Sequence, residues 1–198
     1  MKYILTICTF ILLFSCNEKE NKISYDGAYI NSVISDVIKL DGGEEIKMDA
    51  DSVSKIFYLI RHAEKDTTIK EDPPLSEEGL NRATRLADLL RGTRVDAIYS
   101  TMFLRTLYTV DSLADIKAMK VLPYDNKMLK DLIDQLSTDD DMKAVLFVGH
   151  SNTIPAMTNT LAGKEVYNQV FSDEDYDNFV VVVHFKNGEK QAYPLRFK

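Results

Sequence analysis

Tryptophan is absent from the 198-residue sequence, and the chain contains only two cysteines and three histidines. No two histidines stand at the spacing by which one helix offers two metal ligands, so a metal motif of that kind is excluded. Basic residues are also in the minority, with 24 Lys and Arg against 31 Asp and Glu and a formal net charge of -7. An acidic protein repels phosphate backbones, which argues against a nucleic-acid partner.

Long apolar runs are missing too, because the apolar stretch near the amino terminus covers only residues 3–14. A membrane-spanning helix needs roughly 20 such residues. Lys2 precedes this stretch, and Ser15, Cys16 and polar residues follow it, a pattern typical of a signal peptide. An uncleaved apolar tail is the alternative. The segment "LFSC" also resembles the lipobox of bacterial lipoproteins, which implies cleavage before Cys16 and attachment of lipid to its sulfur.

Cleavage at that point would leave Cys16 as the one cysteine of the mature chain, because Cys8 departs with the peptide. No intrachain disulfide can then form, although an exported compartment would allow one. Loss of Lys2 takes the formal charge from -7 to -8. We therefore predict a lipid-anchored protein of the cell envelope, held to the membrane through Cys16.

The remainder of the chain is long enough for one domain with a substantial core. We predict a signal peptide over residues 1–15, a polar tether over 16–23 and one domain over 24–198. Within that domain, residues 24–54 carry no motif, and their pattern is compatible with either strand or helix.

From residue 55 onward, predicted strands alternate with predicted helices. The segment "IFYLI" is typical of a strand buried on both faces, and "PPLSEEGLNRATRLADLLRG" places Leu80, Ala83, Ala87 and Leu90 near helical spacing. Further strands are predicted at 95–100, 120–124 and 143–149, and further helices at 101–116, 126–136 and 150–163. This alternation predicts an α/β fold, a three-layer sandwich whose mostly parallel sheet has helices on both faces. The pattern of residues 178–197 predicts an antiparallel hairpin that turns at an Asn-Gly pair.

Polar side chains follow three of these strands at the point where each strand ends. Arg61 and His62 follow "IFYLI", Ser100 and Arg105 follow "VDAIY", and His150 follows "AVLFVG". The carboxyl ends of parallel strands form the rim at which open α/β sheets bind ligands, so we expect these residues to converge. Guanidinium groups match phosphoryl oxygens in a bidentate manner, and an imidazole is nucleophilic near neutral pH. The sequence therefore predicts a phosphate site that contains a nucleophile.

These residues carry a resemblance to a known family. The segments "LIRHAEK", "IYSTMFLRT" and "VGHSNTIP", together with "PPLSEEGLNRA", resemble the ordered signature of the histidine phosphatase superfamily, the phosphoglycerate-mutase-like proteins. The resemblance covers roughly residues 55 to 162 and implies the phosphoglycerate-mutase-like fold and a phosphatase that uses no metal and no cofactor. It implies that His62 attacks phosphorus and becomes phosphohistidine, while Arg61, Arg105 and His150 surround the phosphoryl oxygens.

The sequence departs from the family pattern at three points. Ala63 replaces the usual glycine, Lys65 stands where many members carry a small hydroxyl residue, and the family's acidic residue is not obvious. Protonation of the leaving oxygen needs an acid. Asp125 is the first candidate, and Glu64 and Asp131 are the rivals.

We therefore predict an enzyme that hydrolyses phosphate monoesters, or phosphohistidine in peptides, so that its partner is a phosphorylated small molecule or peptide. Mutase activity is disfavoured, because an exported protein would not meet phosphorylated glycolytic intermediates. Two alternatives stay open: a non-catalytic lipoprotein that binds a phosphate ligand on the same fold, and a metallohydrolase that uses His62, His150 and a carboxylate. Ser151 lacks the flanking glycine of a hydrolase elbow, and His184 has the surroundings of an ordinary strand residue.

Overall fold

The computed structural model describes residues 27–198. The predicted signal peptide, the lipidation site Cys16 and the tether over 16–23 therefore lie outside the described residues, and the domain boundary at residue 24 stays a prediction. Within residues 27–198, none of the helices combines the length and the apolar character needed to cross a bilayer.

The described chain forms one nine-stranded sheet in the order β3-β2-β1-β9-β8-β4-β7-β5-β6. The strands are β1 (Ala28–Ile34), β2 (Val37–Leu40), β3 (Glu45–Lys47), β4 (Val53–Arg61), β5 (Ala97–Ser100), β6 (Val121–Pro123), β7 (Ala144–Gly149), β8 (Asn178–Phe185) and β9 (Lys190–Arg196). The helices are α1 (Glu77–Leu90), α2 (Leu104–Ile116), α3 (Leu129–Thr138) and α4 (Thr153–Ala162), with a 3-10 turn η1 (Asn126–Met128).

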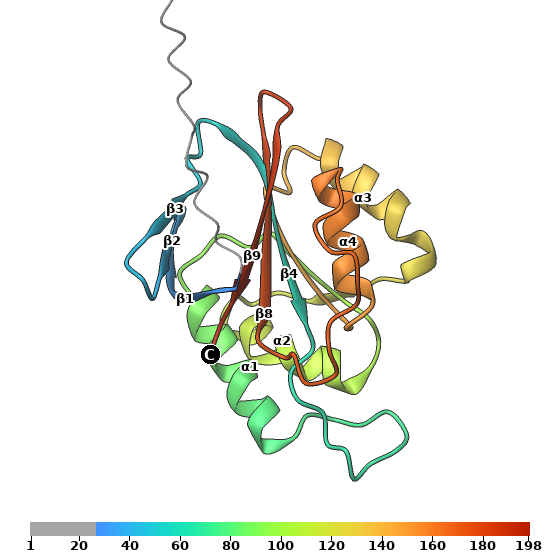
Figure 1. Ribbon diagram of the computed structural model, residues 1–198. Coiled ribbons are helices and arrows are strands. Elements are labelled where there is room, and N and C mark those ends of the chain that lie inside the picture. Colours follow the sequence, from blue (N-terminus) through green and yellow to red (C-terminus); the bar gives the residue numbers. More distant parts are fainter. Residues whose placement is uncertain (1–26) are drawn as a thin grey trace, which may run out of the picture.

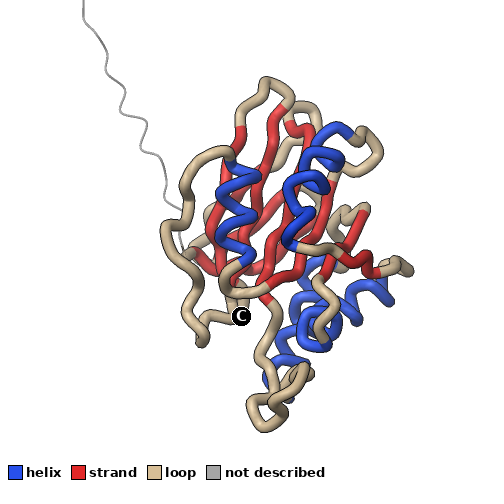
Figure 2. Tube along the Cα trace, turned by 90° about the vertical axis from the view of Figure 1, so that its right-hand side faces the viewer, coloured by secondary structure: helices blue, strands red, loops and turns tan. Residues whose placement is uncertain are grey.

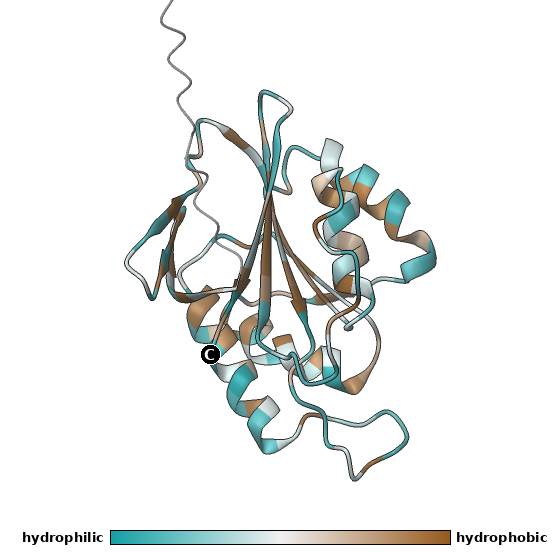
Figure 3. Cartoon of the chain, in the orientation of Figure 1, coloured by the Kyte–Doolittle hydropathy of each residue, from teal (hydrophilic) through white to brown (hydrophobic). Residues whose placement is uncertain are grey.

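Two helical layers enclose the sheet. Helices α1 and α2 lie on one face, and α3 and α4 lie on the other (Figures 1 and 2). Successive side chains of β4 point to opposite faces of the sheet. Tyr58 and Ile60 pack in the core beneath α1 and α2. Phe57 and Leu59 pack in the core beneath α3 and α4. In Figure 3, the central strands are mostly hydrophobic and the outer loops mostly hydrophilic.

The predicted fold class is confirmed, but the sheet is mixed rather than mostly parallel. Strands β4, β7, β5 and β6 pair in parallel, and β8 and β9 form the predicted antiparallel hairpin. The difference comes from the amino-terminal extension and the hairpin. Strands β1 to β3, which the sequence left open between strand and helix, pair antiparallel with one another, and β8 pairs antiparallel with β4.

Helix α1 begins where its sequence signals place it. The hydroxyl of the N-cap residue Ser76 accepts a hydrogen bond from the backbone N–H of Gly79, at 3.2 Å. Leu80, one of the four residues near helical spacing, does not face the core, because its exposed fraction is 52%. Gly79, one position earlier, takes the inward side at this end of the helix, where a Cβ atom would collide with the backbone of Glu64. The residues of α1 that are buried are Gly79, Ala83, Leu86, Ala87 and Leu90.

This close approach gives a stability prediction for Gly79→Ala. The new methyl group meets the carbonyl of Glu64, a backbone atom that cannot rotate away, so the helix must shift. We expect a loss of about 1–3 kcal/mol in the free energy of unfolding, the usual range for overpacking. Gly92→Ala is the matched control, because nothing lies within 4 Å of the Cβ position there. Urea denaturation followed by circular dichroism measures both; equal stabilities for the two variants would contradict the prediction.

Candidate active site

The register between two neighbouring strands places the two site histidines side by side. Strands β4 and β7 are parallel, and Arg61 is the register partner of Gly149. The residues that follow each strand are therefore adjacent, and the ring centroids of His62 and His150 lie 5.4 Å apart. Gly149 admits no side chain, since a Cβ atom would lie 2.5 Å from the hydroxyl of Thr153.

His62 is buried, and only one of its ring nitrogens has a partner in the described chain. Its Nδ1 lies 2.8 Å from the carbonyl oxygen of Ala63, and because a carbonyl can only accept, Nδ1 carries the proton. Nε2 of the neutral ring therefore keeps its lone pair. Burial, assisted by the charges of Arg61 and Arg105, lowers the pKa of His62 to about 3. The imidazole is thus neutral at physiological pH, which is the form that a nucleophile needs.

His150 is oriented by a chain of threonine hydroxyls. Thr106 donates to the carbonyl of Thr101 at 2.7 Å, so its oxygen accepts from the Thr101 hydroxyl, at 3.1 Å. The Thr101 oxygen in turn accepts from Nε2 of His150, at 2.9 Å. This leaves Nδ1 of the ring for a ligand. Burial and the charges of Arg105 and Arg61 lower the pKa of His150 to about 4.

Arg61 is 3% exposed, and backbone carbonyls of the loop before β8 hold its guanidinium. Nη1 donates to the carbonyls of Ser172 (2.6 Å) and Asp175 (3.2 Å), and Nη2 donates to that of Asp173 (3.2 Å). The ring of Tyr176 stacks on the guanidinium, 4.2 Å from Cζ to the ring centroid. Its Nε, in contrast, is a buried donor without a protein partner among the described residues. A buried N–H left unpaired in this way is costly unless a ligand accepts from it, which marks an anion position.

Arg105 enters the site from the first turn of α2. Its Cζ lies 4.5 Å from the ring centroid of Phe103, and its Nη1 lies 3.7 Å from Oδ1 of Asp72. The same oxygen of Asp72 accepts the backbone N–H of Leu104 at 3.1 Å. Asp72 adopts a left-handed backbone conformation with φ 42°. The loop before α1 therefore supplies both a cap for α2 and a counter-charge for Arg105.

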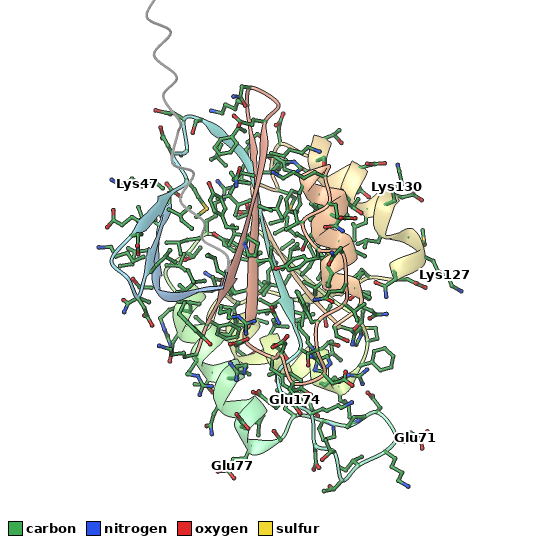
Figure 4. The ribbon with its side chains drawn as sticks, viewed as in Figure 1. Lys47, Glu71, Glu77, Lys127, Lys130 and Glu174 are labelled. Carbon is green, nitrogen blue, oxygen red and sulfur yellow. The ribbon has the colours of Figure 1, made fainter. Side chains whose placement is uncertain are left out.

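The three candidate acids lie elsewhere or are already engaged. Asp125 follows β6, three strand spacings or roughly 14 Å from β4, and its Oδ1 accepts the N–H of Lys127. Figure 4 labels Lys127 on the side of α3, away from Glu71 and Glu174 at the lower end of the molecule. Glu64 is held by Arg82 through both carboxylate oxygens, at 2.6 to 3.0 Å. Asp131 is an exposed residue in the first turn of α3.

The third histidine stands apart from this group. Nε2 of His184 donates to the carbonyl of Leu161 at 2.8 Å, and its ring packs against Phe57. Within the described part of the chain, no three histidine, cysteine, aspartate or glutamate side chains come together in a way that could hold a metal ion.

The structure thus brings together Arg61, His62, Arg105 and His150, and their catalytic roles stay predictions. Sequence reasoning missed the residues that hold them: Thr101, Thr106, Asp72, Tyr176 and the carbonyls of 172–175. The acidic run "SDEDYDN" has the composition of a solvated loop, and yet its backbone binds Arg61. No local signal distinguishes a loop that offers carbonyls from one that faces water.

Comparison with protein families gives one match. The model described as the histidine phosphatase superfamily (branch 1) matches residues 57–127, a segment that includes Arg61, His62 and Arg105. His150 lies beyond it. A search of curated protein sequences finds no match.

Solved structures share the fold at low identity. The protein histidine phosphatase SixA complexed with tungstate aligns with a TM-score of 0.56 and 18% identity, over 69% of this chain and 93% of that one. A mycobacterial glucosyl-3-phosphoglycerate phosphatase aligns with a TM-score of 0.58 and 13% identity, over 73% and 99% of the two chains. Phosphoserine phosphatase from Entamoeba histolytica, in complex with 3-phosphoglyceric acid, gives 0.55 and 16%, over 70% and 94%. At these identities the likeness establishes the fold.

The contacts of Asp72 predict a stability difference between two substitutions. Asp72→Ala removes the carboxylate that accepts the N–H of Leu104. It also leaves alanine, whose side chain cannot form a hydrogen bond, in a left-handed backbone conformation. We therefore expect a loss of about 1–2 kcal/mol in the free energy of unfolding. Asp72→Asn keeps an accepting oxygen and tolerates the left-handed conformation, so its loss is expected to be a few tenths of a kcal/mol. Urea denaturation distinguishes them. An equal, large loss in both variants would show that the charge facing Arg105 matters rather than the cap.

Proposed function

We propose that the chain is a member of the histidine phosphatase superfamily, whose model matches residues 57–127, and that it hydrolyses phosphate monoesters, or phosphohistidine in peptides, through a phosphohistidine intermediate on His62. One observation carries the proposal. Nε2 of His62 keeps a lone pair beside a second imidazole and beside a buried arginine whose Nε lacks an acceptor. A nucleophile next to unsatisfied donors suits a phosphoryl group better than a neutral ligand.

The first step transfers the phosphoryl group. Nε2 of His62 forms the N–P bond while the bond from phosphorus to the leaving oxygen breaks, and that oxygen takes up a proton. In the second step, water attacks phosphorus, the N–P bond breaks, and the water loses a proton as phosphate forms. His62 then returns to its neutral state with the proton still on Nδ1, held by the carbonyl of Ala63.

In this mechanism, the charged groups of the site lower the barrier by stabilising the negative charge that develops on the phosphoryl oxygens. Arg61 and Arg105 both act on His62 and His150, since the charge of each lowers the pKa of both rings. A dianionic phosphate has the opposite effect, because a negative charge raises the pKa of a neighbouring imidazole. Nδ1 of His150 can therefore take a proton once the substrate is bound and donate it to a phosphoryl oxygen.

The substrate class follows from the same charges. Two guanidiniums neutralise a phosphate without a metal, which supports a metal-independent enzyme. The structurally similar proteins named above are a protein histidine phosphatase and phosphatases of phosphorylated small molecules, so both kinds of substrate are candidates for this chain.

A second candidate function is binding of a phosphate ligand without catalysis. It is favoured by the placement of the acids, because Asp125 lies three strands away and Glu64 is engaged by Arg82. A site that binds phosphate but cannot protonate the leaving oxygen would retain its ligand.

The test is turnover of a panel of phosphate esters and a phosphohistidine peptide by His62→Ala, with excess chelator present. Loss of the nucleophile is expected to lower kcat roughly 10³-fold or more, with folding intact by circular dichroism. His184→Gln is the matched control: it lies outside the site, and its amide can still donate to Leu161, so it is expected to keep full activity.

Rapid quenching of the wild-type protein with labelled substrate is expected to leave label on His62 that is stable in alkali and lost in acid. Phosphate binding by the wild type, with no turnover and no label, would favour the non-catalytic function. Loss of all activity on chelation would contradict metal independence.

We also propose that the protein is exported and anchored by lipid on Cys16, at the membrane surface of the cell envelope. The support is the sequence alone: a basic start, a short apolar stretch, and "LFSC" directly before a polar segment. A lipid on the cysteine would place the phosphatase domain beside the membrane on a short tether.

Metabolic labelling with radioactive palmitate in a bacterial host tests this anchor. The wild-type protein is expected to incorporate label and sediment with membranes, and Cys16→Ser is expected to do neither. Cys8→Ser is the matched control, because Cys8 lies in the peptide that is removed. Equal labelling of the wild type and Cys16→Ser would overturn the proposal.

A further inference from the structure

A cavity of about 210 Å³ lies at the end of the sheet opposite the candidate active site. It is lined by the first residues of β4, by the turn between β1 and β2, and by the segment that leads from β3 into β4. From Ile56 in this lining to His62 is six residues of extended strand, or roughly 20 Å. The family match begins at residue 57, so the turn between β1 and β2 and the segment after β3, which form part of the wall, precede the matched segment.

The floor of the cavity is apolar and contains one buried hydroxyl. Met48, Val53 and Ile56 line it together with Tyr58, which is 1% exposed. Among residues 27–198, no hydrogen bond to the Tyr58 hydroxyl is found, and Tyr58 lines the cavity. Burial raises the pKa of this phenol, which keeps the hydroxyl protonated and able to donate. A ligand that enters the cavity can accept a hydrogen bond from this hydroxyl in place of water.

Charge at the mouth of the cavity is predominantly positive. Arg94, Lys143 and Lys186 line it, against the single carboxylate of Asp36. Two of these cations are paired with carboxylates outside the lining, Arg94 with Asp96 and Lys143 with Asp140. The ammonium group of Lys186 forms no ion pair within the described chain, and its one hydrogen bond, to the carbonyl of Ala50, is 3.4 Å long. Its ammonium group is therefore available to a ligand.

We propose that this cavity binds a small organic anion with an apolar body, whose charged group meets Lys186 and whose apolar part covers Met48, Val53 and Ile56. The ligand is small, because 210 Å³ corresponds to roughly seven water molecules and lies below the range of sites for drug-sized molecules. The Tyr58 hydroxyl donates to the ligand's acceptor group. The site is separate from the phosphoryl site, and its occupancy is independent of catalysis at His62.

Isothermal titration calorimetry with hexanoate tests the site, with hexan-1-ol and hexylamine as probes of the same chain length. Hexanoate is expected to bind with a stoichiometry of one, and the neutral and cationic probes at least tenfold more weakly. Lys186→Met is expected to weaken hexanoate at least tenfold, the effect of one charge-assisted hydrogen bond, and Tyr58→Phe severalfold. Lys190→Met is the matched control, because Lys190 lies in the same hairpin but does not line the cavity.

The outcomes separate the proposal from its rivals. Absence of saturable hexanoate binding would overturn it, as would hexylamine binding at least as tightly as hexanoate. Equal binding of hexan-1-ol and hexanoate would show an apolar cavity that does not select anions, and an equal effect of Lys186→Met and Lys190→Met would show nonspecific attraction to surface charge. Because the readout is binding alone, its failure leaves the proposed phosphatase activity untouched.

Discussion

The parallel register of β4 against β7 is the constraint on which the site depends. It pairs Arg61 with Gly149, and the next residue of each strand is a histidine. Strand pairing is fixed by the many apolar residues that the two strands bury on both faces, so the position of the histidines does not depend on any polar contact between them. A shift of one residue would turn His62 to the other face and exchange the side chains that β4 places in the two cores, so both cores would have to repack. The hydrophobic pattern therefore enforces the geometry of the imidazole pair.

The same geometry buries Arg61. The cost of removing its guanidinium from water is offset by hydrogen bonds to the carboxyl-terminal part of the chain. A guanidinium taken out of water is costly unless its donors are satisfied, and three backbone carbonyls before β8 accept most of them. The same loop is fixed at its far end, where Arg196 donates to Asp177 at 2.7 Å. The orientation of Arg61 is thus linked through one loop to the last strand of the sheet, and its Nε has no acceptor among the described residues.

Much of the fold could be predicted because its signals are local. The apolar run ending at Arg61, the N-cap at Ser76 and the Asn-Gly turn of the last hairpin are each read from a few neighbouring residues. The order of strands is not local, so the sequence could not show that the strand before Asp125 lies at the edge of the sheet, and the role of Asp125 stays a prediction. Asp72 and Tyr176 escaped notice for the same reason, since their partners lie more than thirty residues away in the sequence.

The electrostatics of the site make binding and protonation a single event. Without a ligand, burial and two guanidiniums hold both histidines in the neutral form, so the pocket carries the charge of its arginines alone. A phosphate dianion cancels that charge and reverses its effect on the rings. The Nδ1 proton of His62 is held by Ala63, so its free nitrogen is Nε2, whereas Nε2 of His150 is held by Thr101, so its free nitrogen is Nδ1. In the proposed mechanism, the hydrogen bond that each ring already makes therefore gives two similar side chains different roles, with His62 as the nucleophile and His150 as the donor.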